Sequence, residues 1–280
     1  MKAGMIGLGA MGLGMARNLA KAGYLSAVYN RTAEKTTEFK MAAYPSPEEL
    51  AAEVDIVLIC VSADQDVLDI VDAIAKTIKP GAIVVDMSTV SSETAKKAAA
   101  ILAEKQVAFL DAPVSGGVEG AKNSTLAMMV GGDAEALEKA WPVLAAMTSR
   151  IMHMGATGSG QATKAVNQVM CAGINQAVTE ALAFAQAQGL AMDKVIDVIS
   201  GGASGNWFLE HRGSTMTHGT FASGFKLALH HKDLKICQEM AAQTGFLIPL
   251  TDITVSDYEQ LMTMGFGDED ISALYRLKNR

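Results

Sequence analysis

The feature that most constrains the fold lies at the start of the chain, where an apolar segment, residues 3–8, runs into the hexapeptide Gly7-Leu8-Gly9-Ala10-Met11-Gly12. A helical pattern over residues 13–22 and a second apolar segment, 25–29, come next. Glycines in this position let the backbone turn sharply and let a pyrophosphate approach the helix N-terminus, where free N–H groups and the dipole favour anions. Glycines so spaced also close ordinary loops, but the preceding strand and the following helix predict dinucleotide binding here.

The end of the second predicted strand carries the next diagnostic residues, Asn30, Arg31 and Thr32. A chain that binds NAD usually has an aspartate or glutamate here to hold the ribose hydroxyls. Without that carboxylate nothing repels a 2′-phosphate, and Arg31 with Thr32 can bind one through charge-assisted hydrogen bonds. The other interpretation is a helix-capping Asn or Thr beside a solvated Arg. We predict NADP(H) as the preferred cofactor, with NAD as the alternative.

Strands and helices alternate through the first half of the chain and predict a doubly wound, Rossmann-like sheet. About seven strands precede residue 155, the later ones at residues 56–61, 82–85, 107–110, 126–130 and 150–153. The helices between them cover residues 64–78, 92–104 and 134–147. Ligands of such sheets lie beyond the carboxyl ends of the strands, which places these residues in the cofactor crevice: Val61, Ser62, Ser88 and Thr89. Taken alone, Ser88 and Thr89 would be ordinary helix caps.

The second half lacks a convincing strand and is predicted to be all helical. Its first helix covers residues 158–188, which contain no proline and are followed by Gly189, and further helices are expected at 193–200, 206–216, 226–244 and 249–264. The change of pattern predicts a nucleotide-binding domain over residues 1–157 and an all-α domain over 158–280, with the long helix connecting them.

Along the long helix, polar side chains recur at steps of three or four and share one face: Lys164, Asn167, Gln168, Cys171 and Asn175. Spacing alone favours a solvated stripe on an amphipathic helix. The motifs on either side of the helix shift the interpretation towards a functional face.

Composition bounds the partners of the chain. Its 280 residues include 23 basic and 30 acidic side chains, a net charge of −7, without a basic cluster, which argues against nucleic acid and anionic membranes. No apolar segment reaches membrane-spanning length, and a first strand at residue 3 leaves no room for a signal peptide. Three widely spaced cysteines in apolar sequence indicate buried thiols, so we expect a cytoplasmic protein. The histidines show no metal-ligand spacing, so no metal is expected.

A serine followed by two glycines, Ser115-Gly116-Gly117, ends the segment that follows the strand at residues 107–110. Such a loop exposes N–H groups and a hydroxyl and is a good receptor for a carboxylate, although plain turn chemistry competes with this view. Neither Ser115 nor Ser204 has the flanking glycines of a nucleophile elbow, so serine hydrolase chemistry is unsupported.

Together these motifs closely resemble the β-hydroxyacid dehydrogenases, a family that includes 3-hydroxyisobutyrate dehydrogenase and the glyoxylate/succinic semialdehyde and tartronate semialdehyde reductases. Four blocks match in order over essentially the whole chain, and the second and third are specific to the group. They are the glycine-rich hexapeptide with Met15-Ala16-Arg17-Asn18-Leu19, then Asp111-Ala112-Pro113-Val114-Ser115-Gly116-Gly117, then Gly158-Ser159-Gly160-Gln161-Ala162-Thr163-Lys164-Ala165-Val166-Asn167, and Lys232-Asp233-Leu234. The resemblance implies a Rossmann-like domain, a long interdomain helix and a helical C-terminal domain that closes the active site.

The resemblance also assigns roles within these blocks. It implies that Lys164 is the catalytic lysine and that Asn167 orients the substrate. The other implied contacts are Ser115, Gly116 and Gly117 with the substrate carboxylate, Thr89 near nicotinamide and substrate, Phe225 and Asp233 with the substrate, and Lys232 with the cofactor.

The expected reaction is reversible hydride transfer between NADP(H) and a small β-hydroxyacid or semialdehyde acid, with Lys164 as general acid and base. The sequence Asn30-Arg31-Thr32 resembles the NADPH-preferring aldehyde reductases rather than the Asp-bearing 3-hydroxyisobutyrate enzymes. The alternatives are NAD-linked oxidation of 3-hydroxyisobutyrate or L-serine and, in another class, a non-catalytic NADP-binding sensor. The apolar helices of the second half need cover, so we expect a homodimer or a homotetramer.

Overall fold

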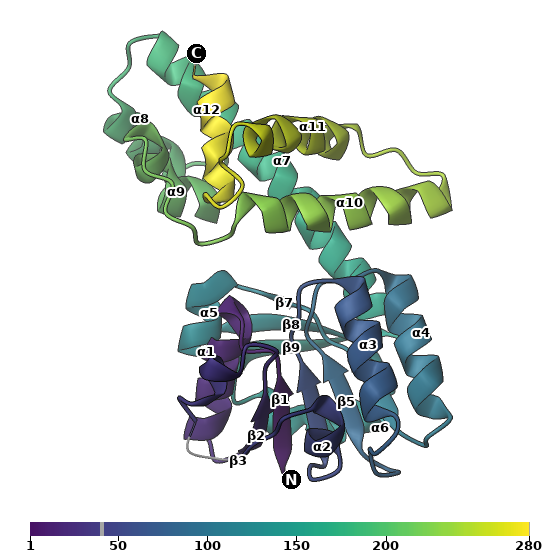
Figure 1. The fold of residues 1–280 in the computed structure, drawn as a ribbon. Coiled ribbons are helices and arrows are strands. Elements are labelled where there is room, and N and C mark those ends of the chain that lie inside the picture. Colours follow the sequence, from purple (N-terminus) through teal and green to yellow (C-terminus); the bar gives the residue numbers. More distant parts are fainter. Residues whose placement is uncertain (40–41, 280) are drawn as a thin grey trace. The chain divides into compact units, whose positions relative to one another are not determined.

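The computed structural model describes residues 1–39 and 42–279, and the chain divides into two compact units, Met1–Lys164 and Ala165–Arg280 (Figure 1). One helix, α7 (Ser159–Ala187), carries the chain from the first unit into the second. It agrees with the helix predicted over residues 158–188 to within one residue at each end. The predicted domain boundary lies just before α7, whereas the division between the two units falls within α7, between Lys164 and Ala165.

The first unit is built on one sheet, in which the described residues contribute nine strands. They are β1 (Ala3–Ile6), β2 (Leu25–Tyr29), β3 (Ala42–Ala43), β4 (Ile56–Ile59), β5 (Ile83–Asp86), β6 (Ala108–Asp111), β7 (Val114–Ser115), β8 (Leu126–Gly132) and β9 (Thr148–Gly155). Their order is β3-β2-β1-β4-β5-β6-β8-β7, and β9 also pairs with β8. Strands β1 to β6 pair in parallel, and β8 runs antiparallel to β6 and β7. The chain therefore builds outwards from β1 in both directions, which confirms the predicted doubly wound fold.

Helices cover both faces of this sheet (Figure 1). One face packs on α1 (Ala10–Lys21), α5 (Gly117–Asn123) and α6 (Ala134–Leu144), and the other on α2 (Pro47–Ala51), α3 (Asp64–Ile74) and α4 (Ser92–Ala103). Strand β4 shows why: all four of its residues are buried, Ile56 and Leu58 in one apolar cluster and Val57 and Ile59 in the other. A continuous apolar strand of this kind is typical of parallel sheets that are covered on both sides.

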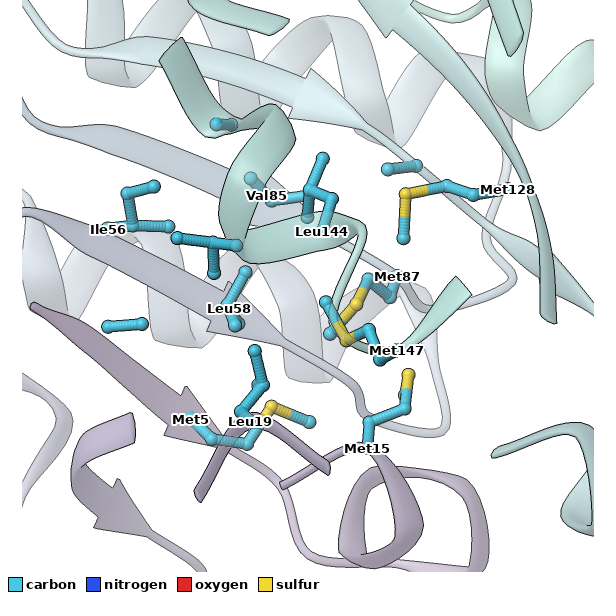
Figure 2. Close-up of a cluster of buried hydrophobic side chains, with 14 of the residues drawn as sticks. Met5, Met15, Leu19, Ile56, Leu58, Val85, Met87, Met128, Leu144 and Met147 are labelled. Atoms are coloured by element: carbon cyan, nitrogen blue, oxygen red, sulfur yellow. The ribbon is translucent and has the colours of Figure 1, made fainter. Parts of the chain in front are cut away.

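Figure 2 shows the apolar cluster on the α1 side of the sheet. It joins Met5 of β1 and Val85 of β5 to Met15 of α1 and Leu144 of α6. Because this core fills the space between sheet and helices, the helices are held firmly relative to the strand ends where the candidate site lies.

The structure differs from the predicted pattern of this unit in three short elements and in the length of one helix. Strands β3 and β7 have two residues each, which is too few to show an alternation of apolar and polar side chains. Helix α5 begins at Gly117 and contains Gly120, and because glycine is a poor helix former, no helix was predicted over this segment. Helix α3 ends at Ile74 rather than residue 78.

The second unit consists of helices over the residues that the structure describes. Besides most of α7, these are α8 (Met192–Ser200), α9 (Trp207–Thr217), α10 (Leu227–Thr244), α11 (Pro249–Thr263), the 3₁₀ turn η2 (Ile271–Leu274) and α12 (Tyr275–Lys278). Their core includes Leu182 of α7, Leu234 of α10 and Tyr258 of α11, all with at most 1% exposure. Among residues 1–39 and 42–279, no helix is long and apolar enough to cross a membrane.

The polar stripe of α7 is buried at Lys164, Gln168 and Asn175 and half-buried at Asn167 and Cys171, so the solvated stripe that spacing alone favoured is wrong. Asn175 is fully buried and Gln168 is 1% exposed, whereas the apolar side chains of Val166 and Met170 are 63% and 62% exposed. Within the second unit Asn175 donates to the hydroxyl of Tyr258 at 2.9 Å. Helix α7 therefore presents its polar face to the protein interior.

Candidate functional site

The glycine-rich turn between β1 and α1 has the shape that an anion requires. Gly7 has φ +97°, and a Cβ there would lie 2.2 Å from the carbonyl oxygen of Cys60. A Cβ on Gly12 would lie 2.0 Å from the carbonyl oxygen of Gly7. The middle glycine, Gly9, has nothing within 4 Å of where its Cβ would be, and it precedes α1 without a side-chain cap. Two glycines therefore shape the turn, and the third leaves room for a pyrophosphate at the helix N-terminus.

A cavity of about 540 Å³ adjoins this turn. Its walls come from the glycine-rich turn with the start of α1 and from the segment after β2: Leu8, Gly9, Ala10, Leu13, Glu34, Lys35, Thr37 and Glu38. The cavity lies at the carboxyl ends of β1 and β2, where a doubly wound sheet binds the adenosine part of a dinucleotide.

Asn30 and Arg31 differ in how firmly they are held. The side chain of Asn30 accepts from the N–H of Leu8 at 2.7 Å and donates to the carbonyl oxygen of Thr32 at 2.8 Å. The side chain of Arg31 is 88% exposed and reaches Asp66 at only 3.5 Å. Asn30 is thus committed to the backbone of the turn, while Arg31 gives up little by turning to a ligand.

The next two strand ends meet through a buried serine. The hydroxyl of Ser88, at the end of β5, accepts from the N–H of Val61, at the end of β4, at 2.9 Å. The N–H of Ser88 donates to Asp86 at 3.0 Å. Ser88 is 2% exposed, Val61 and Thr89 are half-buried, and Ser62 is exposed. The structure therefore brings together the two segments that were assigned to the crevice.

Two ionisable groups close to these segments in sequence, the buried Asp86 and the half-buried Cys60, were not predicted as part of the site. Burial raises the pKa of Asp86 to about 7, although bonds from Ser88 oppose the effect, and burial raises the pKa of the Cys60 thiol to about 12. Among the described residues Oδ2 of Asp86 has no hydrogen-bond partner. A carboxylate at the end of an apolar strand gives no sequence signal of such an environment.

The start of α7 is fixed to the end of β6 by a buried aspartate. The carboxylate of Asp111 accepts from the N–H of Gly158 at 2.8 Å and from the N–H of Gln161 at 2.9 Å. Burial raises the pKa of Asp111, and these N–H groups oppose that rise. Gly160 packs so closely that a Cβ there would lie 2.3 Å from the carbonyl oxygen of Asp111. This docking sets the position of Lys164, one turn further along α7 and 7% exposed.

Ser115, Gly116 and Gly117 lie at the rim of the same sheet. Ser115 ends strand β7, opposite Ala127 of β8, and Gly117 is the first residue of α5, so the predicted loop is shorter than expected. Gly116 has φ +132°, a conformation that suits glycine. Ser115 is half-buried and both glycines are exposed.

In the second unit, a chain of hydrogen bonds links three of the predicted residues. Asn167 donates to the side chain of Gln168 at 2.8 Å, and Gln168 donates to Asp233 at 2.6 Å. Asp233 also pairs with Lys232 at 2.9 Å. Gln168, placed on the polar stripe but given no role, is the residue that joins Asn167 to α10.

Phe225 is held at the start of α10 by Asp270, a residue that the sequence did not single out. The carboxylate of Asp270 accepts from the N–H groups of Gly224 and Phe225 at 3.0 Å each and pairs with Arg212 at 3.4 Å. The ring of Phe225 lies 5.1 Å from that of His230, measured between centroids. The described residues contain no group of His, Cys, Asp and Glu side chains that could hold a metal ion.

Comparisons with known proteins agree with this geometry. Residues 2–155 match the family described as the NAD binding domain of 6-phosphogluconate dehydrogenase. Residues 158–278 match the family described as NAD-binding of NADP-dependent 3-hydroxyisobutyrate dehydrogenase.

Individual relatives match over nearly their full length. An oxidoreductase of Shewanella frigidimarina is 39% identical over 98% of this chain and 96% of its own. The NAD-dependent L-serine dehydrogenase of Pseudomonas aeruginosa is 35% identical over 97% of this chain and 96% of its own. The structure of Mycobacterium tuberculosis 3-hydroxyisobutyrate dehydrogenase with L-serine superimposes with a TM-score of 0.91, at 32% identity, over 100% of this chain and 99% of that one.

Fold, nucleotide cradle and relatives together define an NAD(P)-dependent oxidoreductase that acts on CH–OH groups. The chain belongs to the β-hydroxyacid dehydrogenase family, as the sequence motifs predicted.

Proposed function

We propose that the protein is an NADPH-dependent reductase of small semialdehyde acids, such as glyoxylate, succinic semialdehyde or tartronate semialdehyde, with Lys164 as its general acid. The observation that carries the proposal is the fixed start of α7. Asp111 holds the first turn through Gly158 and Gln161, which supports a fixed position for Lys164, 7% exposed, on the next turn of α7.

The bound nicotinamide supplies the hydride in reduction and accepts it in oxidation. In the direction of reduction, Lys164 donates a proton to the carbonyl oxygen of the substrate, on which negative charge develops. In the direction of oxidation, the lysine takes the hydroxyl proton back. A positioned acid of this kind contributes roughly 10²–10⁴ in rate.

The remaining predicted residues fix the substrate. In this proposal Ser115, Gly116 and Gly117 hold the substrate carboxylate through a hydroxyl and backbone N–H groups, so the reacting carbon is presented in one orientation. The second unit contributes Asn167, Phe225 and Asp233 to the substrate and Lys232 to the cofactor. The hydrogen-bonded chain from Asn167 through Gln168 to Asp233 supports grouping these residues.

The cofactor preference is proposed from the segment after β2. Val61, Ser62 and Thr89 line the cofactor at the neighbouring strand ends, and Arg31 with Thr32 binds the 2′-phosphate. The amide of Asn30, tied to Leu8 and Thr32, carries no charge that would repel a phosphate. Arg31→Ala should raise the KM for NADPH far more than that for NADH, and equal changes would contradict the phosphate contact.

NAD-linked oxidation of L-serine or 3-hydroxyisobutyrate is the second candidate. It is favoured by the relative from Pseudomonas aeruginosa, an NAD-dependent L-serine dehydrogenase, and by the neighbouring structure that contains L-serine. Kinetics with both cofactors in both directions distinguish the two candidates. A non-catalytic sensor, the third, would bind NADPH without turning over any substrate.

The deciding experiment is a screen of small semialdehydes with NADPH, followed by absorbance, in wild type and Lys164→Ala. We expect Lys164→Ala to lose nearly all turnover while its Kd for NADPH stays close to that of wild type. Lys139→Ala, which removes an exposed lysine of α6, is the matched control and should stay fully active. A fully active Lys164→Ala enzyme would remove the acid–base role.

We propose self-association from the apolar surface of the second unit. Phe184, Phe246 and Leu247 are 66%, 70% and 82% exposed, respectively. Exposed apolar side chains of this size are typical of subunit interfaces, so we expect a homodimer or homotetramer, which sedimentation would show. The three cysteines are thiols, which favours the reducing cytoplasm as the place of action.

A further inference from the structure

We propose that Gln161 is a positioning residue for the reaction, because its buried amide binds the peptide groups on both sides of Thr89 and holds them against the start of α7. The inference rests on the proposed function, since it concerns the placement of Thr89 and Lys164. In this inference Gln161 keeps the distance between Thr89 and Lys164 constant.

Both ends of the Gln161 amide take part in this contact. Its Nε2 donates to the carbonyl oxygen of Ser88 at 2.8 Å, and its Oε1 accepts from the N–H of Val90 at 3.2 Å. Those two groups belong to the peptide bonds that flank Thr89. Gln161, Ser88 and Val90 are only 1–2% exposed, whereas Thr89 between Ser88 and Val90 is half-buried. A neutral amide offers one donor and one acceptor in this arrangement, as the two peptide groups require.

The backbone of the same residue is anchored elsewhere. The N–H of Gln161 donates to Asp111 at the end of β6 at 2.9 Å, so one residue ties the loop after β5 to the end of β6. Lys164 follows Gln161 by three positions and therefore lies one turn along the same face of α7. A displacement of Gln161 would change the distance between Thr89 and the lysine.

Other hydrogen bonds also hold the loop that contains Thr89. The effect of Gln161 on the position of this loop can therefore be distinguished from an effect on folding. Ser88 also binds Asp86 through its N–H and Val61 through its hydroxyl, at 3.0 and 2.9 Å. The first unit should therefore fold without the amide, with the Thr89 segment shifted rather than lost. A misplacement of about 1 Å near the reacting groups can lower the rate on the order of 10²-fold.

The first test compares Gln161→Leu with Gln176→Leu in the full-length protein. Gln176 is a second buried glutamine of α7; it donates to Thr254 and Asp257 in the second unit and has no place in the catalytic machinery. Both variants should lose thermal stability because each removes two hydrogen bonds of a buried amide. Only Gln161→Leu should show a lower kcat, by on the order of 10- to 10²-fold, and its Kd for NADPH should change much less.

The second test uses Gln161→Glu and a pH profile. A protonated glutamic acid can accept from Val90 and donate to Ser88 as the amide does, whereas the carboxylate can only repel the carbonyl oxygen. The ratio of kcat in Gln161→Glu to kcat in wild type should therefore rise as the pH falls from about 8 to about 5, and a role confined to stability would leave this ratio flat. If Gln161→Leu does not fold, this profile still decides.

The outcomes distinguish the inference from the proposed function. Absence of any NADPH-dependent turnover in wild type would remove the proposed function itself. An active wild type together with unchanged kcat in a destabilised Gln161→Leu, or with a flat ratio for Gln161→Glu, would overturn the positioning role alone.

Discussion

Oδ1 of Asn30 accepts a hydrogen bond from the backbone N–H of Leu8 at 2.7 Å and so ties the end of β2 to the glycine-rich turn. Its Nδ2 donates to the carbonyl oxygen of Thr32 at 2.8 Å. A carboxylate could make the first bond but not the second, because it has no proton to donate. The amide thus satisfies the backbone and keeps the region of the proposed 2′-phosphate free of negative charge.

Asn30→Asp should therefore shift the cofactor preference towards NADH. The aspartate would keep the bond from Leu8, hold the ribose hydroxyls of NADH and repel the phosphate of NADPH. We expect kcat/KM for NADPH to fall by about one to two orders of magnitude, the cost of a negative charge placed beside the phosphate, while that for NADH rises or stays constant. Asn123→Asp, which adds the same charge at an exposed position of α5, should change neither value. Parallel losses with both cofactors would contradict the prediction.

Asp270 should be the most sensitive acidic residue of the second unit. It is 1% exposed and accepts from the N–H groups of Gly224, Phe225 and Ser272 at 3.0–3.1 Å, besides its ion pair with Arg212. Asp270→Ala would leave these N–H donors without their acceptor and remove the ion pair of the half-buried Arg212, at a cost of about 3 kcal/mol in the free energy of unfolding. Urea unfolding followed by helical circular dichroism would measure it.

Asp268→Ala is the matched control for that experiment. Asp268 pairs with Lys226 at 2.8 Å, but its side chain is 90% exposed, so solvent screens the interaction. Its removal should leave the unfolding midpoint where it is in wild type. Equal effects of the two substitutions would refute the special role of Asp270.

Much of this fold could be predicted because its signals are local. A window of some thirty residues is enough to recognise the glycine-rich hexapeptide, an apolar strand such as β4 or the proline-free α7. The predicted doubly wound fold and the predicted family were both confirmed. Strands β3 and β7 were not predicted because they are strands only through their pairing with β2 and β8. Two residues are too short a segment for their sequence to indicate such pairing.

The buried polar contacts could not be predicted for a related reason. Gln161 meets Ser88 across 73 positions of sequence, and Asp270 meets Gly224 across 46. The side of α7 that faces inwards was also undetermined by spacing, because a solvated stripe and a buried polar stripe have the same period. Only the folded structure shows that Asn175 and Gln168 are enclosed. The roles assigned to Lys164, Ser115 and Asn167 stay predictions.

Gly160→Ala should disturb the start of α7 more than its small size suggests. A Cβ there would lie 2.3 Å from the carbonyl oxygen of Asp111 and 2.5 Å from that of Met129, and both are backbone atoms of the sheet. Because neither can yield easily, the first turn of α7 must move. We expect a loss of about 1–3 kcal/mol in the free energy of unfolding, and reduced kcat through the displaced Lys164.

Gly201→Ala provides the control for the added methyl group. Gly201 has φ −80°, and the nearest atom to its Cβ position is 3.9 Å away, so alanine fits without strain. Its melting temperature and kcat should equal those of wild type. A Gly160→Ala protein with wild-type kcat would show that the docking of α7 does not set the lysine.

Asp86 should make the stability of the first unit depend on pH. Burial raises the pKa of Asp86 to about 7 in the folded protein, with the charges of Asp111 and Asp64 adding to the effect. The unfolded chain releases this proton near pH 4, about three units lower. Between these values the folded state binds more protons than the unfolded state, so stability falls as the pH rises from about 4 to about 7, by about 4 kcal/mol in total.

Asp86→Asn mimics the protonated carboxyl and should remove that dependence. Urea unfolding at pH 5 and pH 8 should show wild type losing stability at the higher pH, while the variant exceeds wild type at pH 8 and approaches it at pH 5. Asp72→Asn, the same change at an exposed position of α3, corrects for the altered net charge. If Asp86→Asn and Asp72→Asn keep the same pH dependence, Asp86 is already ionised in the folded protein. Oδ2 of Asp86, which has no hydrogen-bond partner within residues 1–39 and 42–279, would then need a positive group or a water molecule beside it.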